Sequence, residues 1–223
     1  MGVSKVMRKF DAVIFDMDGL MVDTERMMQK EVKEIIKEMG FSVTEEITLK
    51  LIGLTDSRTK NILEQEYGKE FRHDIFLKKL LDRKEMVYHN DEIPVKKGLW
   101  ELLEFLKKEN IKSIVATGSV RESMNLILQR TGILEHFTLS VCGDEIERGK
   151  PYPDIFLKAV EKLNVSPKRC LILEDSQNGI IAAKSAGIEV IFIKDLVTPE
   201  KQYIEQIYAE CSDLSDVIQY LKK

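Results

Sequence analysis

Residues 12–19 read AVIFDMDG, a run of four apolar residues that ends abruptly in two carboxylates, Asp16 and Asp18. A short apolar run that stops at a polar turn is typical of a strand buried on both faces of a sheet. The same arrangement occurs again in SIVATGS at 113–119 and in CLILEDS at 170–176. These segments predict a parallel sheet whose strands end in polar side chains.

Helical patterns separate these strand-like segments. An apolar helix face recurs within residues 99–106, 153–163 and 178–186, and residues 139–142 and 189–193 each predict another strand. Strands that alternate with helices indicate βαβ units. We therefore expect an α/β fold with a Rossmann-like parallel sheet.

One long block of the chain, residues 25–92, shows helical patterns without a strand-like run. The first of its helices is expected to stop at Gly40, since glycine commonly follows a helix C-terminus. A block of this kind between the first strand and the rest of the sheet indicates an insertion. We predict an α/β core formed by residues 1–23 and 93–223, and an inserted all-helical cap formed by residues 24–92.

The composition excludes several classes of protein. The 34 basic and 38 acidic residues give a net charge of −4, which argues against a protein that coats nucleic acid. The three cysteines form no CxxC pair, and the three histidines have no zinc-like spacing. The apolar run near the N-terminus is too short for a signal peptide, and no stretch reaches the length of a membrane span. We expect a cytoplasmic monomer without nucleic-acid or membrane partners.

Polar side chains follow three of the predicted strands. Asp16 and Asp18 follow the first, Thr117 follows the second, and Glu174 and Asp175 end the fourth. In an open α/β sheet, ligands bind outside the carboxyl ends of the strands, so these side chains are expected to meet at one edge. Clustered carboxylates repel one another and require a cation, and Mg²⁺ prefers oxygen ligands. The pattern therefore favours a magnesium site.

A phosphate ester is the substrate that suits this set. One carboxylate can attack phosphorus, and a second can protonate the leaving oxygen and then activate water. Thr117, the Gly118 amide and Lys150 can donate to phosphate oxygens. Ser119 and Glu122 form an S-x-x-E pattern that predicts a capping box for the next helix. Each pattern alone is also typical of an ordinary structural turn, and only their order along a βαβ chain favours function.

Four segments carry a resemblance to a known superfamily: FDMDGLMVDTE, VATGS, GKPYPDIF and LILEDSQNGIIAAKSAGI. In this order they resemble the four motifs of the haloacid dehalogenase (HAD) superfamily of phosphatases and phosphomutases. The resemblance covers residues 8–24 and 93–194. The helical insert resembles the C1-type cap of the branch that contains β-phosphoglucomutase.

The resemblance implies a role for each matching residue. Asp16 is implied as the nucleophile, and Asp18 as the general acid and base. The phosphoryl group is implied to be held by Thr117, Gly118 and Lys150. The magnesium ion is implied to be held by Asp16, Asp18 through its backbone carbonyl, Glu174 and Asp175. Dehalogenation is not expected, because the dehalogenases of the superfamily lack a carboxylate at the position of Asp18.

Several functions remain open, and we favour a phosphatase that acts on a small phosphorylated metabolite through an aspartyl-phosphate. A β-phosphoglucomutase is the first alternative, but Met28 stands where those enzymes usually have His. Asp56, in GLTDSRT at 53–59, stands where they have Arg, unless Arg58 takes that place after a shift of the alignment, and an acid there would repel a second phosphate. A phosphonate hydrolase would need a Schiff-base lysine, for which Lys50 and Lys84 are candidates. A non-catalytic binding module would be expected to lack some of the acidic residues.

Overall fold

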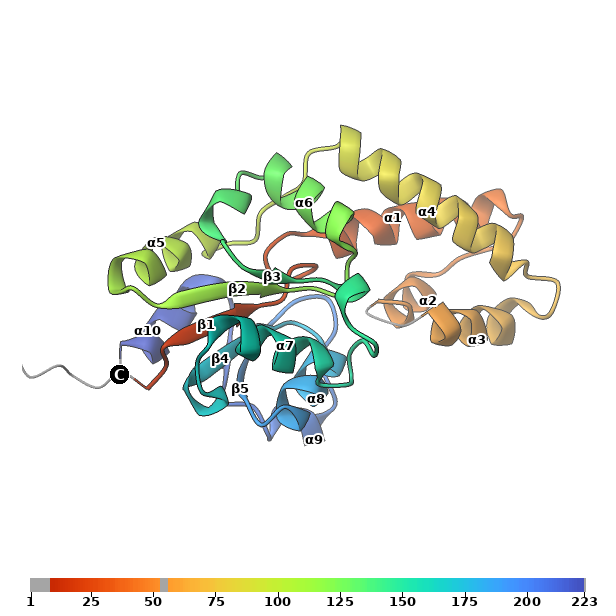
Figure 1. The fold of residues 1–223 in the computed structure, drawn as a ribbon. Coiled ribbons are helices and arrows are strands. Elements are labelled where there is room, and N and C mark those ends of the chain that lie inside the picture. Colours follow the sequence, from red (N-terminus) through yellow and green to blue (C-terminus); the bar gives the residue numbers. More distant parts are fainter. Residues whose placement is uncertain (1–8, 53–55, 223) are drawn as a thin grey trace, which may run out of the picture. The chain divides into compact units, whose positions relative to one another are not determined.

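The computed structural model describes residues 9–52 and 56–222. Two compact units make up the chain (Figure 1). The first comprises the residues up to Val22 and from Val95 onward, and the second is Asp23–Pro94. Each unit has a hydrophobic core of its own.

The first unit is built on a six-stranded sheet with the order β3-β2-β1-β4-β5-β6. Its strands are β1 (Ala12–Phe15), β2 (Lys112–Ala116), β3 (Ser140–Val141), β4 (Cys170–Glu174), β5 (Glu189–Ile193) and β6 (Ala209–Cys211). All neighbouring strands are parallel. The Rossmann-like α/β fold expected from the sequence is confirmed.

Helices lie on both sides of this sheet (Figure 1). They are α5 (Leu99–Glu109), α6 (Arg121–Arg130), α7 (Asp154–Leu163), α8 (Gln177–Ser185), α9 (Lys201–Ile204) and α10 (Ile218–Leu221), with the 3-10 turns η1 (Leu134–His136), η2 (Gly143–Glu145), η3 (Pro167–Arg169) and η4 (Leu214–Val217). All four residues of β1 are fully buried. One face of this strand packs in the same core cluster as Ile155 and Phe156 of α7. Burial on both faces explains why β1 is a continuous apolar run.

The second unit is helical in the part that the structure describes. Its helices are α1 (Thr24–Glu38), α2 (Glu45–Lys50), α3 (Asp56–Tyr67) and α4 (His73–Asn90). Its core contains Ile35, Ile36, Leu63, Phe71 and Phe76. Gly40 has a φ of +87°, which an L side chain rarely adopts, and it follows α1 as the sequence predicts.

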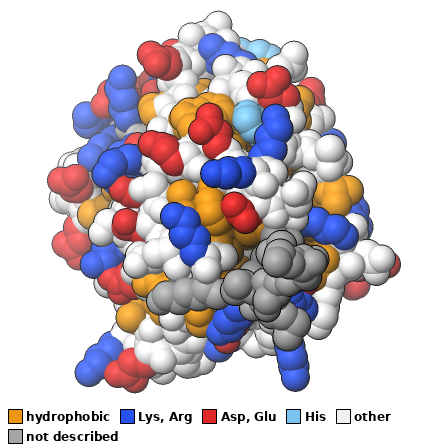
Figure 2. All heavy atoms as spheres, turned by 90° about the vertical axis from the view of Figure 1, so that its left-hand side faces the viewer, with side chains coloured by type: hydrophobic (Ala, Val, Ile, Leu, Met, Phe, Trp, Pro, Cys, Tyr) orange, Lys and Arg blue, Asp and Glu red, His pale blue; other side chains and the backbone are white. Residues whose placement is uncertain are grey.

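Charges of both signs cover the surface. On the face seen in Figure 2, Lys and Arg side chains lie among Asp and Glu side chains instead of gathering in a basic patch. A helix able to cross a membrane is absent from residues 9–52 and 56–222, since none combines the required length with an apolar composition.

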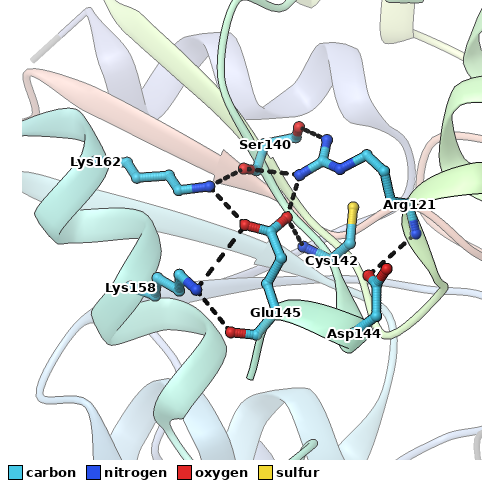
Figure 3. A network of polar contacts seen from close by, with 7 residues as sticks. All are labelled: Arg121, Ser140, Cys142, Asp144, Glu145, Lys158 and Lys162. Atoms are coloured by element: carbon cyan, nitrogen blue, oxygen red, sulfur yellow. Dashed lines mark hydrogen bonds and ion pairs between the residues drawn. The ribbon is translucent and has the colours of Figure 1, made fainter. Parts of the chain in front are cut away.

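A polar network joins the end of β3 to α6 and α7 (Figure 3). The Glu145 carboxylate accepts hydrogen bonds from the Arg121 guanidinium, from Lys162 at 2.8 Å and from the Cys142 amide at 3.1 Å. Lys158 donates to the Glu145 backbone carbonyl at 2.6 Å. Burial alone would raise the pKa of Glu145, but the hydrogen bonds from Lys162 and Arg121 outweigh burial and lower this pKa to about 2.

This lowered pKa predicts a loss of stability in acid. A carboxylate whose pKa is lower in the folded state stabilises the fold fully above its unfolded pKa of 4.5, and this stabilisation falls away as the pH drops towards 2. We expect Glu145→Gln to be less stable than wild type by about 1–3 kcal/mol at pH 6, with the difference shrinking below pH 4.5. Urea unfolding from pH 6 to pH 2.5 measures it, and a pH-independent difference would contradict the assignment.

Candidate active site

Side chains from three neighbouring strands meet at the carboxyl edge of the sheet. Asp16 follows β1, Thr117 follows β2, and Glu174 ends β4. Because β1 lies between β2 and β4, these three residues occupy adjacent positions at the edge. All three are buried, Thr117 and Glu174 completely. The convergence that the sequence predicts for these residues is therefore present in the structure.

Lys150 brings a partly buried positive charge to this edge. Its ammonium group contacts the carboxylates of both Asp16 and Glu174. The Lys150 nitrogen also lies over the ring of Phe156 in α7, 5.1 Å from the ring centre. Burial alone would lower the pKa of Lys150, but the charges of Asp16 and Glu174 outweigh burial and raise it. The two carboxylates therefore favour the charged form of Lys150.

Glu174 is held in one orientation by its own turn. One carboxylate oxygen accepts hydrogen bonds from the amides of Asp175 and Ser176, at 3.1 and 3.2 Å, and from the Ser176 hydroxyl at 2.9 Å. The Ser176 hydroxyl also accepts the Gly179 amide at 3.0 Å and so caps α8. A Cβ at Gly179 would lie 1.9 Å from the Glu174 carboxyl carbon. Neither Ser176 nor Gly179 was predicted to belong to the site, although Ser is a common N-cap residue at the start of a helix.

The turn after β2 holds Asp18. The hydroxyls of Thr117 and Ser119 donate to the same oxygen of Asp18, at 3.2 and 2.8 Å. The Ser119 amide in turn donates to the Thr117 hydroxyl at 3.0 Å. Between them lies Gly118, at which a Cβ would meet no atom within 4 Å. The turn therefore leaves open space beside Gly118 and orients the Asp18 carboxylate.

The predicted capping box of Ser119 and Glu122 is wrong. Helix α6 begins at Arg121 and its N-cap residue is Val120, whose side chain makes no capping hydrogen bond. Ser119 lies one residue too early and its hydroxyl is bonded to Asp18. The Arg121 amide donates instead to a carboxylate from a distant segment, that of Asp144, at 3.1 Å.

The carboxylates fit a divalent cation. Asp16, Glu174 and Asp175 each offer an oxygen, and these oxygens lie within 4.8 Å of one another. Burial raises the pKa of Asp16 to about 8, with contributions from the Glu174 and Asp18 charges, although Lys150 opposes the shift. The three carboxyl groups of Asp16, Glu174 and Asp175 outnumber the single ammonium group of Lys150, and an all-oxygen donor set is the one that Mg²⁺ prefers. Asp18 lies outside this group, and its backbone carbonyl stays a predicted ligand.

The residues named for the alternative functions lie in the helical unit. Lys50 forms an ion pair with Glu46 at 2.6 Å, and the hydrogen bond from this ion pair raises the pKa of Lys50. The Lys84 ammonium lies over the Tyr88 ring at 5.4 Å. The side chain of Asp56 and residues 53–55 lie outside the described part of the chain.

The chain belongs to the haloacid dehalogenase-like hydrolase family, whose model matches residues 13–193. It is 34% identical over 182 residues to a phosphorylated carbohydrates phosphatase of Thermotoga maritima, in an alignment covering 82% of this chain and 84% of that protein. It is 32% identical over 183 residues to the β-phosphoglucomutase of Bacillus subtilis, covering 79% of this chain and 80% of that enzyme. The expected superfamily and the expected enzyme class, a phosphatase, are confirmed.

A solved structure shares the fold. The crystal structure of CbbY from Rhodobacter sphaeroides in complex with phosphate matches with a TM-score of 0.80 and 24% identity. The match covers 96% of this chain and 100% of that one.

The close contact between Gly179 and Glu174 gives a prediction for stability. In Gly179→Ala the new methyl group must displace a fully buried carboxylate that several donors hold in place. We expect a loss of about 1–3 kcal/mol in the free energy of unfolding, the usual cost of overpacking. Lys184→Ala, at an exposed position of the same helix, is the control and should change stability far less. Equal stability of the two variants would show that Glu174 moves freely.

Proposed function

We propose that the protein is a magnesium-dependent phosphatase that hydrolyses a small phosphorylated carbohydrate through an aspartyl-phosphate on Asp16. One observation carries the proposal: Lys150 lies between Asp16 and Glu174, while Thr117 and Ser119 hold Asp18, which follows Asp16 by two residues. The Thermotoga maritima relative, a phosphatase named for phosphorylated carbohydrates, supports the substrate class.

Asp16 and Asp18 divide the chemistry between them. A carboxylate oxygen of Asp16 attacks phosphorus, the bond from phosphorus to the ester oxygen breaks, and Asp18 donates its proton to the leaving alcohol. Asp18, now a carboxylate, takes a proton from water. The resulting hydroxide attacks phosphorus and breaks its bond to Asp16, which releases inorganic phosphate and restores the proton on Asp18.

The other residues of the site bind charge. Lys150, the Thr117 hydroxyl and the Gly118 amide would hold the phosphoryl oxygens, and the space beside Gly118 leaves room for them. Asp16, Glu174 and Asp175 would hold magnesium, together with the backbone carbonyl of Asp18. Bound Mg²⁺ neutralises the carboxylates and the charge that develops on the phosphoryl group. One oxygen of Glu174 accepts three hydrogen bonds, so its other oxygen, which contacts Lys150, would be the one to hold the metal.

A phosphomutase is the second candidate, because the Bacillus subtilis relative is a β-phosphoglucomutase. A mutase has to hold a doubly phosphorylated sugar, so its helical cap needs cationic groups for the second phosphate. Met28 stands where such enzymes usually have His, and Asp56 stands where they have Arg. These two differences favour hydrolysis over transfer to a sugar.

Removing either carboxylate tests the division of labour. We expect Asp16→Asn to abolish hydrolysis of p-nitrophenyl phosphate with Mg²⁺, because an amide is a poor nucleophile. Asp18→Asn should lose about 10²–10⁴-fold in rate, the usual contribution of general acid and base catalysis. EDTA should stop wild-type turnover, and added Mg²⁺ should restore it.

The control for these variants is Asp82→Asn, which makes the same change at an exposed position of α4 and should keep wild-type activity. Near-normal turnover by Asp16→Asn would eliminate Asp16 as the nucleophile. Full activity in EDTA would rule out the metal requirement while leaving the nucleophile to be judged separately.

The choice between phosphatase and mutase has its own measurement. We expect β-glucose 1-phosphate with a trace of glucose 1,6-bisphosphate to yield inorganic phosphate and little glucose 6-phosphate, because water replaces the sugar as acceptor. Both products are quantified in the same reaction. Conversion to glucose 6-phosphate at about 1–10³ per second, the ordinary enzymatic range, would establish the mutase instead.

A further inference from the structure

The segment 142–145 lies directly behind the turn that holds Asp18. The Gly143 amide donates to the Ser119 carbonyl at 2.9 Å. A Cβ at Gly143 would lie 2.1 Å from the Gly118 carbonyl oxygen, closer than Cβ atoms approach other atoms. The backbone of the 117–119 turn therefore rests on the backbone of Gly143, and a shift of Gly143 has to move the turn.

The next two residues, Asp144 and Glu145, bind the first residue of α6, the helix that follows the same turn (Figure 3). The Asp144 carboxylate accepts the Arg121 amide at 3.1 Å. The Glu145 carboxylate binds the guanidinium group of the same arginine. Arg121 is therefore held at its backbone and at its side-chain end, which fixes the exit of the chain from the turn.

Glu145 also connects this assembly to α7. Its carboxylate accepts a hydrogen bond from Lys162 at 2.8 Å and lies 3.9 Å from the Lys158 nitrogen. Helix α7 carries Phe156, against which the Lys150 ammonium packs. One carboxylate thus joins the turn beside Asp18 to the helix beside Lys150.

The link between α6 and α7 depends on the negative charge of Glu145. Three cations, Arg121, Lys158 and Lys162, surround the Glu145 carboxylate. Without its negative charge, the arginine of α6 and the lysines of α7 would face one another and repel. The low pKa of Glu145 agrees with a carboxylate that stays charged throughout the neutral range.

We infer that Glu145 is a positioning residue for phosphoryl transfer: through Arg121 and Gly143 it fixes the turn formed by Thr117, Gly118 and Ser119. This inference rests on the proposed function, because the turn is where the phosphoryl group and Asp18 would be aligned. Glu145 itself touches no reacting group. Its effect is on the alignment of the reacting groups, to which the rate of transfer is sensitive at the scale of one ångström.

Glu145→Gln tests the inference, because it removes the charge and nearly keeps the shape. Glu210→Gln is the matched control, since Glu210 pairs with Lys194 at 2.6 Å on β6, at the opposite edge of the sheet. With p-nitrophenyl phosphate, we expect kcat to fall about 10–100-fold in Glu145→Gln, with little change in KM. Inhibition by fluoroaluminate, which mimics the transition state, should weaken as much as kcat, and inhibition by inorganic phosphate should weaken less.

A purely structural role would lower the melting temperature of Glu145→Gln and leave kcat per folded molecule equal to that of Glu210→Gln. That result, measured well below both melting temperatures, would overturn the inference. Gly143→Ala provides a second route, because its methyl group pushes on the Gly118 carbonyl with the Glu145 network intact. It should lower kcat in the same way, and it decides the question if Glu145→Gln fails to fold.

Amide hydrogen exchange separates this inference from the proposed function. The Gly143 and Ser119 amides should exchange faster in Glu145→Gln and stay protected in Glu210→Gln, whether or not the wild type hydrolyses a phosphate ester. Unchanged protection would refute the positioning role even in an active phosphatase. An inactive wild type with faster exchange in Glu145→Gln would refute the phosphatase and keep the link between Glu145 and the turn.

Discussion

The Lys150 ammonium lies between the buried carboxylates of Asp16 and Glu174, and the arrangement of the site depends on this contact. An unpaired charge at such depth would be strongly destabilising, so each of the three groups requires the others. The strand order brings these three groups together, because β1 and β4 are neighbours and the loop before α7 returns to their carboxyl ends. With Asp175 close by, the negative charges still outnumber Lys150, which is why a further cation fits.

The sheet was largely predictable because its central strands are buried on both faces. Every residue of β1 and β4 is fully buried, and such strands form apolar runs that sequence alone reveals. The edge strand β6 could not be predicted in this way. It has three residues, Ala209–Cys211, with the exposed Glu210 in its centre, and it pairs only with β5. A short strand of this kind has neither an apolar run nor a long alternation, and only its tertiary partner defines it.

The residues of the site also differ in how far the sequence predicts them. Its carboxylates were predictable because each stands at the end of a recognisable strand. Thr117 and Lys150, which contact them, were predicted as well. The Ser119 hydroxyl as a partner of Asp18, 101 positions away, and Lys162 as a partner of Glu145, 17 positions away, were not, since these bonds join segments far apart. The local pattern of Ser119 with Glu122 predicted a helix cap, yet the tertiary bond to Asp18 took the hydroxyl. Local patterns identify the reacting groups, and long-range contacts decide their orientation.

The short strand β3 explains how one loop contacts the turn beside Asp18 and also carries Lys150 beside Asp16. Because β3 has only two residues, the chain leaves the sheet at Cys142 and passes behind the turn after β2. It then continues through Glu145 to Lys150 within eight residues of Cys142. The segment that supports the turn beside Asp18 is thus covalently continuous with the segment that carries the cation beside Asp16. The backbone contact of Gly143 with the turn and the ion pairs of Lys150 therefore belong to one loop.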